Sequence, residues 1–89
     1  MKLVMTLLVR DEEDVLRANL EFHLAQGVGF FIVTDNKSED STPEIIREYE
    51  ARGVAKYIYE AEDDYNQTKW VTRMARLAAT DYAADWVIN

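Results

Sequence analysis

Clusters of polar side chains follow the apolar stretches of this sequence, and they include groups able to bind a small ligand. The apolar stretches are residues 3–9, 30–33 and 54–59, and the polar residues after them are 10–12, 34–36 and 60–65. The residues before the second and third stretches, 27–29 and 51–53, are plain short turns. This asymmetry favours a binding site at the ends where the polar residues gather.

Asp35 leads the candidates because it follows an apolar run almost directly. A carboxylate accepts two donors in one plane, which suits the imide N–H of a uracil or the N–H edge of a guanine. The competing interpretation is structural, because an Asp at this position also forms an Asx turn or caps the following loop. The residue pattern alone leaves both interpretations open.

Three cations recur with helical spacing near the end of the chain. Lys69, Arg73 and Arg76 stand at i, i+4 and i+7, so they share one helix face that could meet a diphosphate. A solvated helix face explains the same spacing. In the third polar cluster, Asp63 and Asp64 form an acidic pair where a magnesium site is conceivable, although loop carboxylates mostly face solvent.

Other common sites are missing from the sequence. Neither G-x-G-x-x-G nor G-x-x-x-x-G-K-[ST] occurs, which excludes a dinucleotide-binding Rossmann domain and a P-loop enzyme. There is no Ser elbow or His-centred triad. His23 has no second ligand nearby in the sequence and is expected to be a partly buried helix residue. Tyr57, Tyr59 and Trp86 are expected in the core.

Composition limits the class of protein. The 89 residues allow at most one small domain, and 48% hydrophobic residues are typical of a globular chain. Ten Lys and Arg against seventeen Asp and Glu give a net charge of −7, which argues against nucleic-acid binding. Without cysteine there is no disulfide or thiolate zinc site, which fits a reducing compartment and a cytoplasmic location. No stretch reaches the length of a transmembrane segment, and residues 3–9 are too short and too abruptly charged for a signal peptide.

The elements that would position these residues follow from hydrophobic periodicity. Residues 3–9, 30–33, 54–59 and 85–89 are short apolar runs typical of buried strands. Leu16, Leu20 and Leu24 form a helical stripe within residues 14–26, and further helices are expected from Ser41–Glu44 to about Arg52 and over 66–80. The pattern therefore alternates between strand and helix, beginning and ending on a strand.

This alternation predicts an α/β fold with right-handed crossovers. We expect a Rossmann-like three-layer α/β/α arrangement around a parallel four-stranded sheet in the order 3-2-1-4. Ligands of such sheets bind at the carboxyl ends of the strands, where the polar clusters fall.

Three stretches together resemble the family-2-type glycosyltransferases with the GT-A fold. They are TLLVRDEEDVL, FIVTDNKSEDSTPEII and NQTKWVTRMARLAATDYAADWVIN, and the second is the most specific, with its Asp-Asn-x-Ser-x-Asp-x-Thr pattern after a strand. The resemblance spans essentially the whole chain and implies binding of a nucleotide-sugar donor. By the same resemblance, Leu8, Val9, Arg10 and Asp35 hold the nucleotide base. Arg73 approaches the diphosphate, with Lys69 as the second choice.

The sequence ends at residue 89, before two further features of that family. The family's Asp-x-Asp, which binds a divalent metal (Mg or Mn), and its catalytic base and acceptor site have no counterpart in this sequence. Residues 1–89 are therefore expected to be the donor-binding half of an inverting GT-A transferase, inactive alone. We expect self-association through the exposed edge of the strand at 85–89.

Two other functions compete with this one. A non-catalytic α/β module could use the same fold for binding or interaction alone. A phosphoacceptor signalling domain would need its acceptor Asp at the end of the third strand, where only the Asp63-Asp64 pair is offered, and a fifth strand carrying a Lys.

Overall fold

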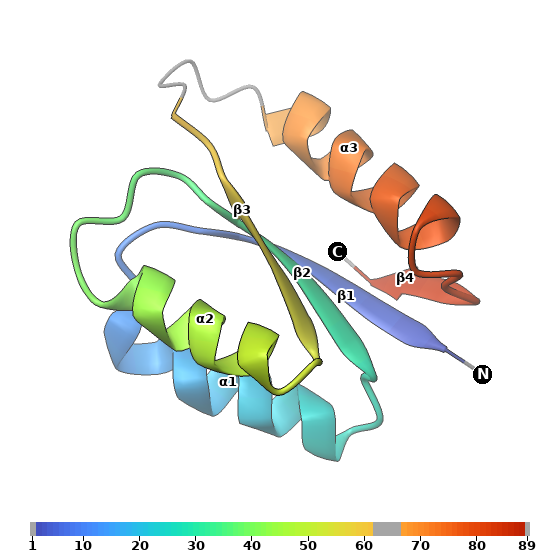
Figure 1. The fold of residues 1–89 in the computed structure, drawn as a ribbon, viewed down its shortest axis with the longest axis horizontal. Coiled ribbons are helices and arrows are strands. Elements are labelled where there is room, and N and C mark those ends of the chain that lie inside the picture. Colours follow the sequence, from blue (N-terminus) through green and yellow to red (C-terminus); the bar gives the residue numbers. More distant parts are fainter. Residues whose placement is uncertain (1, 62–66, 89) are drawn as a thin grey trace.

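A computed structural model describes residues 2–61 and 67–88 of the chain, and it confirms the expected alternation (Figure 1). The elements are β1 (Leu3–Val9), α1 (Glu13–Ala25), β2 (Phe30–Asp35), α2 (Thr42–Ala51), β3 (Ala55–Tyr59), α3 (Gln67–Thr80) and β4 (Trp86–Ile88). The sheet formed by the described residues is entirely parallel, in the order β3-β2-β1-β4. This is the predicted topology.

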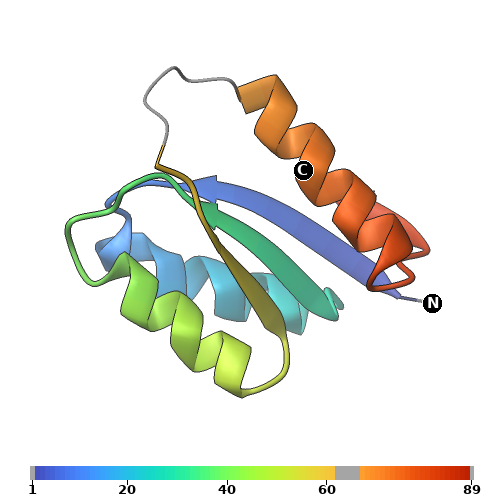
Figure 2. The same cartoon turned by 45° about the horizontal axis from the view of Figure 1, so that its top comes forward.

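The helices lie on both faces of the sheet, so the molecule has three layers (Figure 2). α1 and α2 cover one face, where Leu16, Leu20 and Ile46 pack against Phe31 and Val33 of β2. α3 covers the other face, where Met74 and Ala78 join Val4 and Ile32 in a second, smaller core. β1 and β2 contribute to both cores, because successive side chains of a strand point to opposite faces.

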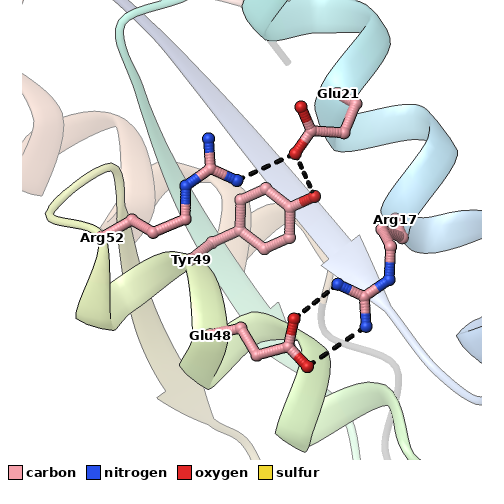
Figure 3. A network of polar contacts seen from close by, with 5 residues as sticks. All are labelled: Arg17, Glu21, Glu48, Tyr49 and Arg52. Atoms are coloured by element: carbon pink, nitrogen blue, oxygen red, sulfur yellow. Dashed lines mark hydrogen bonds and ion pairs between the residues drawn. The ribbon is translucent and has the colours of Figure 1, made fainter.

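α1 and α2 are also joined by a polar network on their outer surfaces (Figure 3). Arg17 of α1 pairs with Glu48 of α2, and Glu21 accepts hydrogen bonds from Tyr49 and Arg52. The Tyr49 hydroxyl, followed by Arg52, lowers the pKa of Glu21. Exposed ion pairs contribute little by themselves, so the nearly buried ring of Tyr49 is the main stabilising contact here.

Two expectations about aromatic residues were wrong. Tyr59 and Trp86 are 55% and 62% exposed rather than core residues, because they lie on the two outer strands, β3 and β4. An outer strand has no neighbour on one side, and the helices cover it only in part. His23 is partly buried as expected, with Nδ1 2.8 Å from the carbonyl oxygen of Asn19.

No helix among the described residues is long and apolar enough to cross a bilayer.

Candidate functional site

The carboxyl ends of β1, β2 and β3 meet at one edge of the sheet. Leu8 lies opposite Thr34, and Val9 lies opposite Asp35, which in turn lies opposite Tyr59. Three of the residues proposed to hold the nucleotide, Leu8, Val9 and Asp35, are therefore on adjacent strands within one or two positions of their ends. Arg10 follows β1 directly, and its side chain is exposed.

Asp35 itself is completely buried, with 0% of its surface exposed. Its Oδ1 accepts the Ser38 amide hydrogen across 3.1 Å, and its Oδ2 accepts the Tyr57 hydroxyl hydrogen across 2.7 Å. The bond to Ser38 closes the turn that the structural interpretation anticipated. A carboxylate has about four acceptor positions, so these two bonds leave capacity for a further donor. Contact between Asp35 and a nucleotide base stays a prediction.

Tyr57 is the partner of Asp35 that the sequence did not reveal. Burial, followed by the hydrogen bond to Asp35, raises the pKa of Tyr57 well above its ordinary value. The phenol is therefore protonated at neutral pH and donates to the carboxylate. The guanidinium of Arg47 lies over the Tyr57 ring, 4.5 Å from its centre, and so ties α2 to the same position.

Hydrogen bonds join the loop after β2 to the start of α1, with side chains of the loop accepting backbone amide hydrogens. Asp40 accepts the amide hydrogens of Glu13 (3.1 Å) and Thr42 (2.8 Å). The Thr42 hydroxyl accepts the amide hydrogen of Glu12 (2.9 Å), and the Ser38 hydroxyl accepts that of Asp11 (2.9 Å). We call these bonds the loop clasp.

The loop clasp explains the spacing of the Asp-Asn-x-Ser-x-Asp-x-Thr stretch. Its Ser, second Asp and Thr satisfy backbone N–H groups at the starts of α1 and α2 that have no partner within a helix. Ser41, which directly precedes α2, makes no capping bond through its side chain. Much of the polarity of this stretch thus fixes the backbone beside the strand ends.

Glu60 connects the loop after β2 with α3. Its amide donates to the Asp35 carbonyl oxygen (2.9 Å), and its carbonyl oxygen accepts from the Asn36 side chain (3.1 Å). Its carboxylate accepts from Arg73 of α3 across 3.3 Å. The Glu60 side chain is only 13% exposed, whereas that of Arg73 is 46% exposed. This contact holds the Arg73 guanidinium at the carboxyl end of β3.

The other two cations of this face lie one turn of α3 to either side of Arg73. Lys69 is exposed one turn before Arg73, nearer the start of α3. Arg76 is exposed one turn further along, toward the amino edge of the sheet. The structure thus joins Arg73 to the strand ends through Glu60, a residue for which the sequence gave no individual role.

β1 offers backbone groups as well as side chains. β4 pairs only with Leu3, Val4 and Met5, so among the described residues no strand lies beside the carboxyl half of β1 on that side. The backbone of Leu8 points to this side, because Val9, one residue further, points toward β2 and accepts the amide hydrogen of Asn36 there. Within residues 2–61 and 67–88, the Leu8 amide and carbonyl therefore face the side of β1 on which no strand is paired with them.

A metal site is not formed by the part of the chain that the structure describes. No group of three or more His, Cys, Asp or Glu side chains in residues 2–61 and 67–88 is arranged to hold a metal ion. Asp63 and Asp64, the magnesium candidates, lie outside the described residues.

A family model for glycosyltransferase family 92 matches residues 5–87. No curated protein and no solved structure matches the chain. The match supports the expectation that the chain is related to glycosyltransferases. The family that matches is family 92, whereas the sequence motifs resembled family 2.

Proposed function

This chain belongs to glycosyltransferase family 92, and we propose that the carboxyl edge of its sheet binds the nucleotide-diphosphate sugar that serves as donor. The observation that carries this proposal is the contact between Arg73 and Glu60, which brings a cation from α3 to the edge where Val9 and Asp35 end their strands. A chain with a net charge of −7 needs such a local cation to hold an anionic ligand.

The base is proposed to lie at the ends of β1 and β2. The backbone amide and carbonyl of Leu8 would supply a donor and an acceptor for a planar base, with Val9 beside it on the strand and Arg10 following at the strand end. Asp35 would accept an N–H of the base, for which it keeps unused acceptor positions. Because Asp35 is buried and bonded to the Ser38 amide, the base is proposed to approach it beside the Ser38 turn.

The diphosphate is proposed to lie between the strand ends and α3. Arg73 uses one nitrogen in its 3.3 Å contact with Glu60, and a guanidinium has five N–H donors in all. The remaining donors suit phosphate oxygens, and charge-assisted bonds of this kind are about twice as strong as neutral ones. Lys69, one turn nearer the start of α3, is the second proposed contact.

In sugar transfer an acceptor hydroxyl oxygen bonds to the donor's anomeric carbon and loses its proton, while the bond from that carbon to the phosphate oxygen breaks. Negative charge then develops on the departing nucleoside diphosphate. Arg73 and Lys69 would stabilise that charge. We propose a GT-A arrangement with an inverting outcome, following the sequence resemblance. The divalent cation that this arrangement implies would need carboxylate ligands, and the described residues do not form such a set. No step is therefore assigned to a metal.

Calorimetric titration with uridine diphosphate, guanosine diphosphate and inorganic pyrophosphate tests the proposal. At least one nucleoside diphosphate should bind more tightly than pyrophosphate, because the base adds contacts at Leu8, Val9 and Asp35. Equal affinity for all three would mean a phosphate site without base recognition. No binding by any of them would contradict the proposal outright.

A further inference from the structure

Tyr59, at the end of β3, is a large aromatic side chain that is exposed beside the candidate site. It is 55% exposed and lies directly opposite Asp35, which is completely buried. Two other large aromatic side chains are similarly exposed, but Phe22 lies in the second half of α1 and Trp86 pairs with Leu3 at the amino edge of the sheet. A single exposed apolar residue is normal on a protein surface, so the surroundings of Tyr59 decide whether it has a function.

The side chains of Tyr59 and Asp35 project in the same direction. Residues opposite each other on neighbouring strands share one face of the sheet, and such strands lie about 4.8 Å apart. Tyr57 shares this face, because it is two residues before Tyr59 and its hydroxyl reaches Asp35. Burial, followed by the hydrogen bond to Asp35, raises the pKa of Tyr57, and the Tyr59 phenol adds to that shift. Tyr59 therefore runs alongside the Asp35–Tyr57 pair.

The two tyrosine rings differ in what covers them. The guanidinium of Arg47 lies over the Tyr57 ring, 4.5 Å from its centre. Within residues 2–61 and 67–88, neither a second ring nor a cation stacks on Tyr59. Tyr59 thus presents an aromatic ring at the carboxyl edge of the sheet that the described part of the chain leaves open.

The lengths of the two side chains place this ring beside the space in front of Asp35. An aspartate side chain is short, whereas a tyrosine ring extends well past the depth of a neighbouring carboxylate. A planar base that donates an N–H to Asp35 would continue outward from the carboxylate, alongside the Tyr59 ring. The separation of the two strands lies within the range of about 4.5–7 Å at which the centres of aromatic rings interact.

We propose that Tyr59 is the surface on which the base of the nucleotide donor stacks, while Asp35 accepts an N–H at the edge of that base. This inference rests on the proposed donor site, and it adds the residue that recognises the plane of the base. Stacking uses the π-face that every base has, so Tyr59 contributes to the affinity for uracil and guanine alike. Discrimination between bases is left to the hydrogen bonds at Asp35 and Leu8.

The position of Tyr59 on a strand suits this role. Its backbone is held by pairing with β2, and a tyrosine side chain has only two rotatable angles, so little conformational entropy is lost when a base packs on it. The ring is uncharged, as is the base. The two halves of the ligand are then bound by different means, the diphosphate by the charge of Arg73 and the base by ring contact with Tyr59.

Calorimetric titration of the whole chain with uridine diphosphate, guanosine diphosphate and inorganic pyrophosphate tests the inference. Tyr59→Ala should weaken binding of both nucleoside diphosphates at least about fivefold, the loss typical of one stacked base. It should leave the affinity for pyrophosphate unchanged, because pyrophosphate has no base. Tyr59→Phe keeps the ring and should bind like the wild type. Phe22→Ala is the matched control, because it removes a similarly exposed ring from α1.

Proton NMR of the nucleotide gives a second readout that a purely structural role would not change. Base protons should shift upfield on binding to the wild type and to Tyr59→Phe, because protons above an aromatic ring are shielded, and this shift should be lost with Tyr59→Ala.

Equal nucleotide affinities of Tyr59→Ala and the wild type would overturn the inference and leave the donor site standing. So would an equal loss of affinity for pyrophosphate, which would indicate damage to the phosphate contacts rather than to base stacking. A wild type that binds neither nucleotide would instead contradict the donor site itself, and the inference with it.

Discussion

Tyr57 of β3 donates its hydroxyl hydrogen to Oδ2 of Asp35 at the end of β2, and the two oxygens lie 2.7 Å apart. Asp35 is fully buried, and its other oxygen accepts the Ser38 amide hydrogen. The carboxylate proposed to read a base is therefore held in place by the protein before any ligand arrives.

Tyr57→Phe should lower the free energy of unfolding by about 1–3 kcal/mol, because it leaves a buried carboxylate oxygen without its donor. Urea denaturation measures this change. Tyr59→Phe is the control, because the Tyr59 side chain is largely exposed and its hydroxyl can exchange a partner for water. Equal stabilities of the Tyr57→Phe variant and the wild type would show that Asp35 does not depend on this bond.

Stability should fall as the solution becomes alkaline. Burial raises the pKa of Tyr57 and of Tyr49, and the carboxylates of Asp35 and Glu21 add to the respective shifts. The folded chain therefore keeps protons that an unfolded tyrosine, with a pKa of about 10, releases. The stabilisation is fully present below about pH 10 and is lost as pH rises through the folded pKa values. Urea denaturation at several pH values measures the decline, which should be shallower for Tyr57→Phe.

Thr42→Val should cost about 1–2 kcal/mol of stability, because it removes the acceptor of the Glu12 amide hydrogen at the start of α1. Thr42 is completely buried, so water cannot replace the lost hydroxyl. Ser41→Ala is the neighbouring control: Ser41 is exposed and makes no side-chain capping bond, so its change should stay within about 0.5 kcal/mol. The loop clasp would lose its proposed role if both variants behaved alike in thermal or urea unfolding.

Arg73→Gln should weaken binding of a nucleoside diphosphate about tenfold or more, the loss expected for one charge-assisted hydrogen bond. Arg76→Gln removes the same charge from the next turn of α3 and should have a much smaller effect on affinity. The comparison distinguishes a direct contact between Arg73 and the diphosphate from a general effect of positive charge on α3. Calorimetry in matched salt compares the two. Equal losses would indicate that only the net charge of α3 matters.

The topology could be predicted because it depends on local patterns. Alternation of short apolar runs with helical stripes determines which segments form strands, and the handedness of crossovers restricts their order. The register of the strands is a different matter. Tyr57 reaches Asp35 only because β3 aligns Asp35 with Tyr59, which puts Tyr57 diagonally across on the same face. No feature of the sequence indicates that alignment.

The exposed aromatics were misjudged for a related reason. Tyr59 and Trp86 have large aromatic side chains of the kind that usually lie in a core. They are exposed because they lie on the outer strands. Glu60 was visible as one of several acidic residues after β3, yet its burial and its bond to Arg73 depend on where α3 packs. Sequence reasoning therefore missed the side chains whose contacts join separate helices and strands.

The central claim is that a nucleotide donor binds at the carboxyl edge of the sheet. The most direct measurement is a titration of the ¹⁵N-labelled chain with uridine or guanosine diphosphate, followed by amide chemical shifts in two-dimensional NMR. We expect saturable shifts at Leu8–Arg10, Asp35–Ser38, Glu60 and Lys69–Arg73, while amides at the amino edge, such as Gly29 and Asp85, stay unchanged. Shifts confined to the amino edge or to the outer faces of α1 and α2, or no saturable shifts with either nucleotide, would contradict the account.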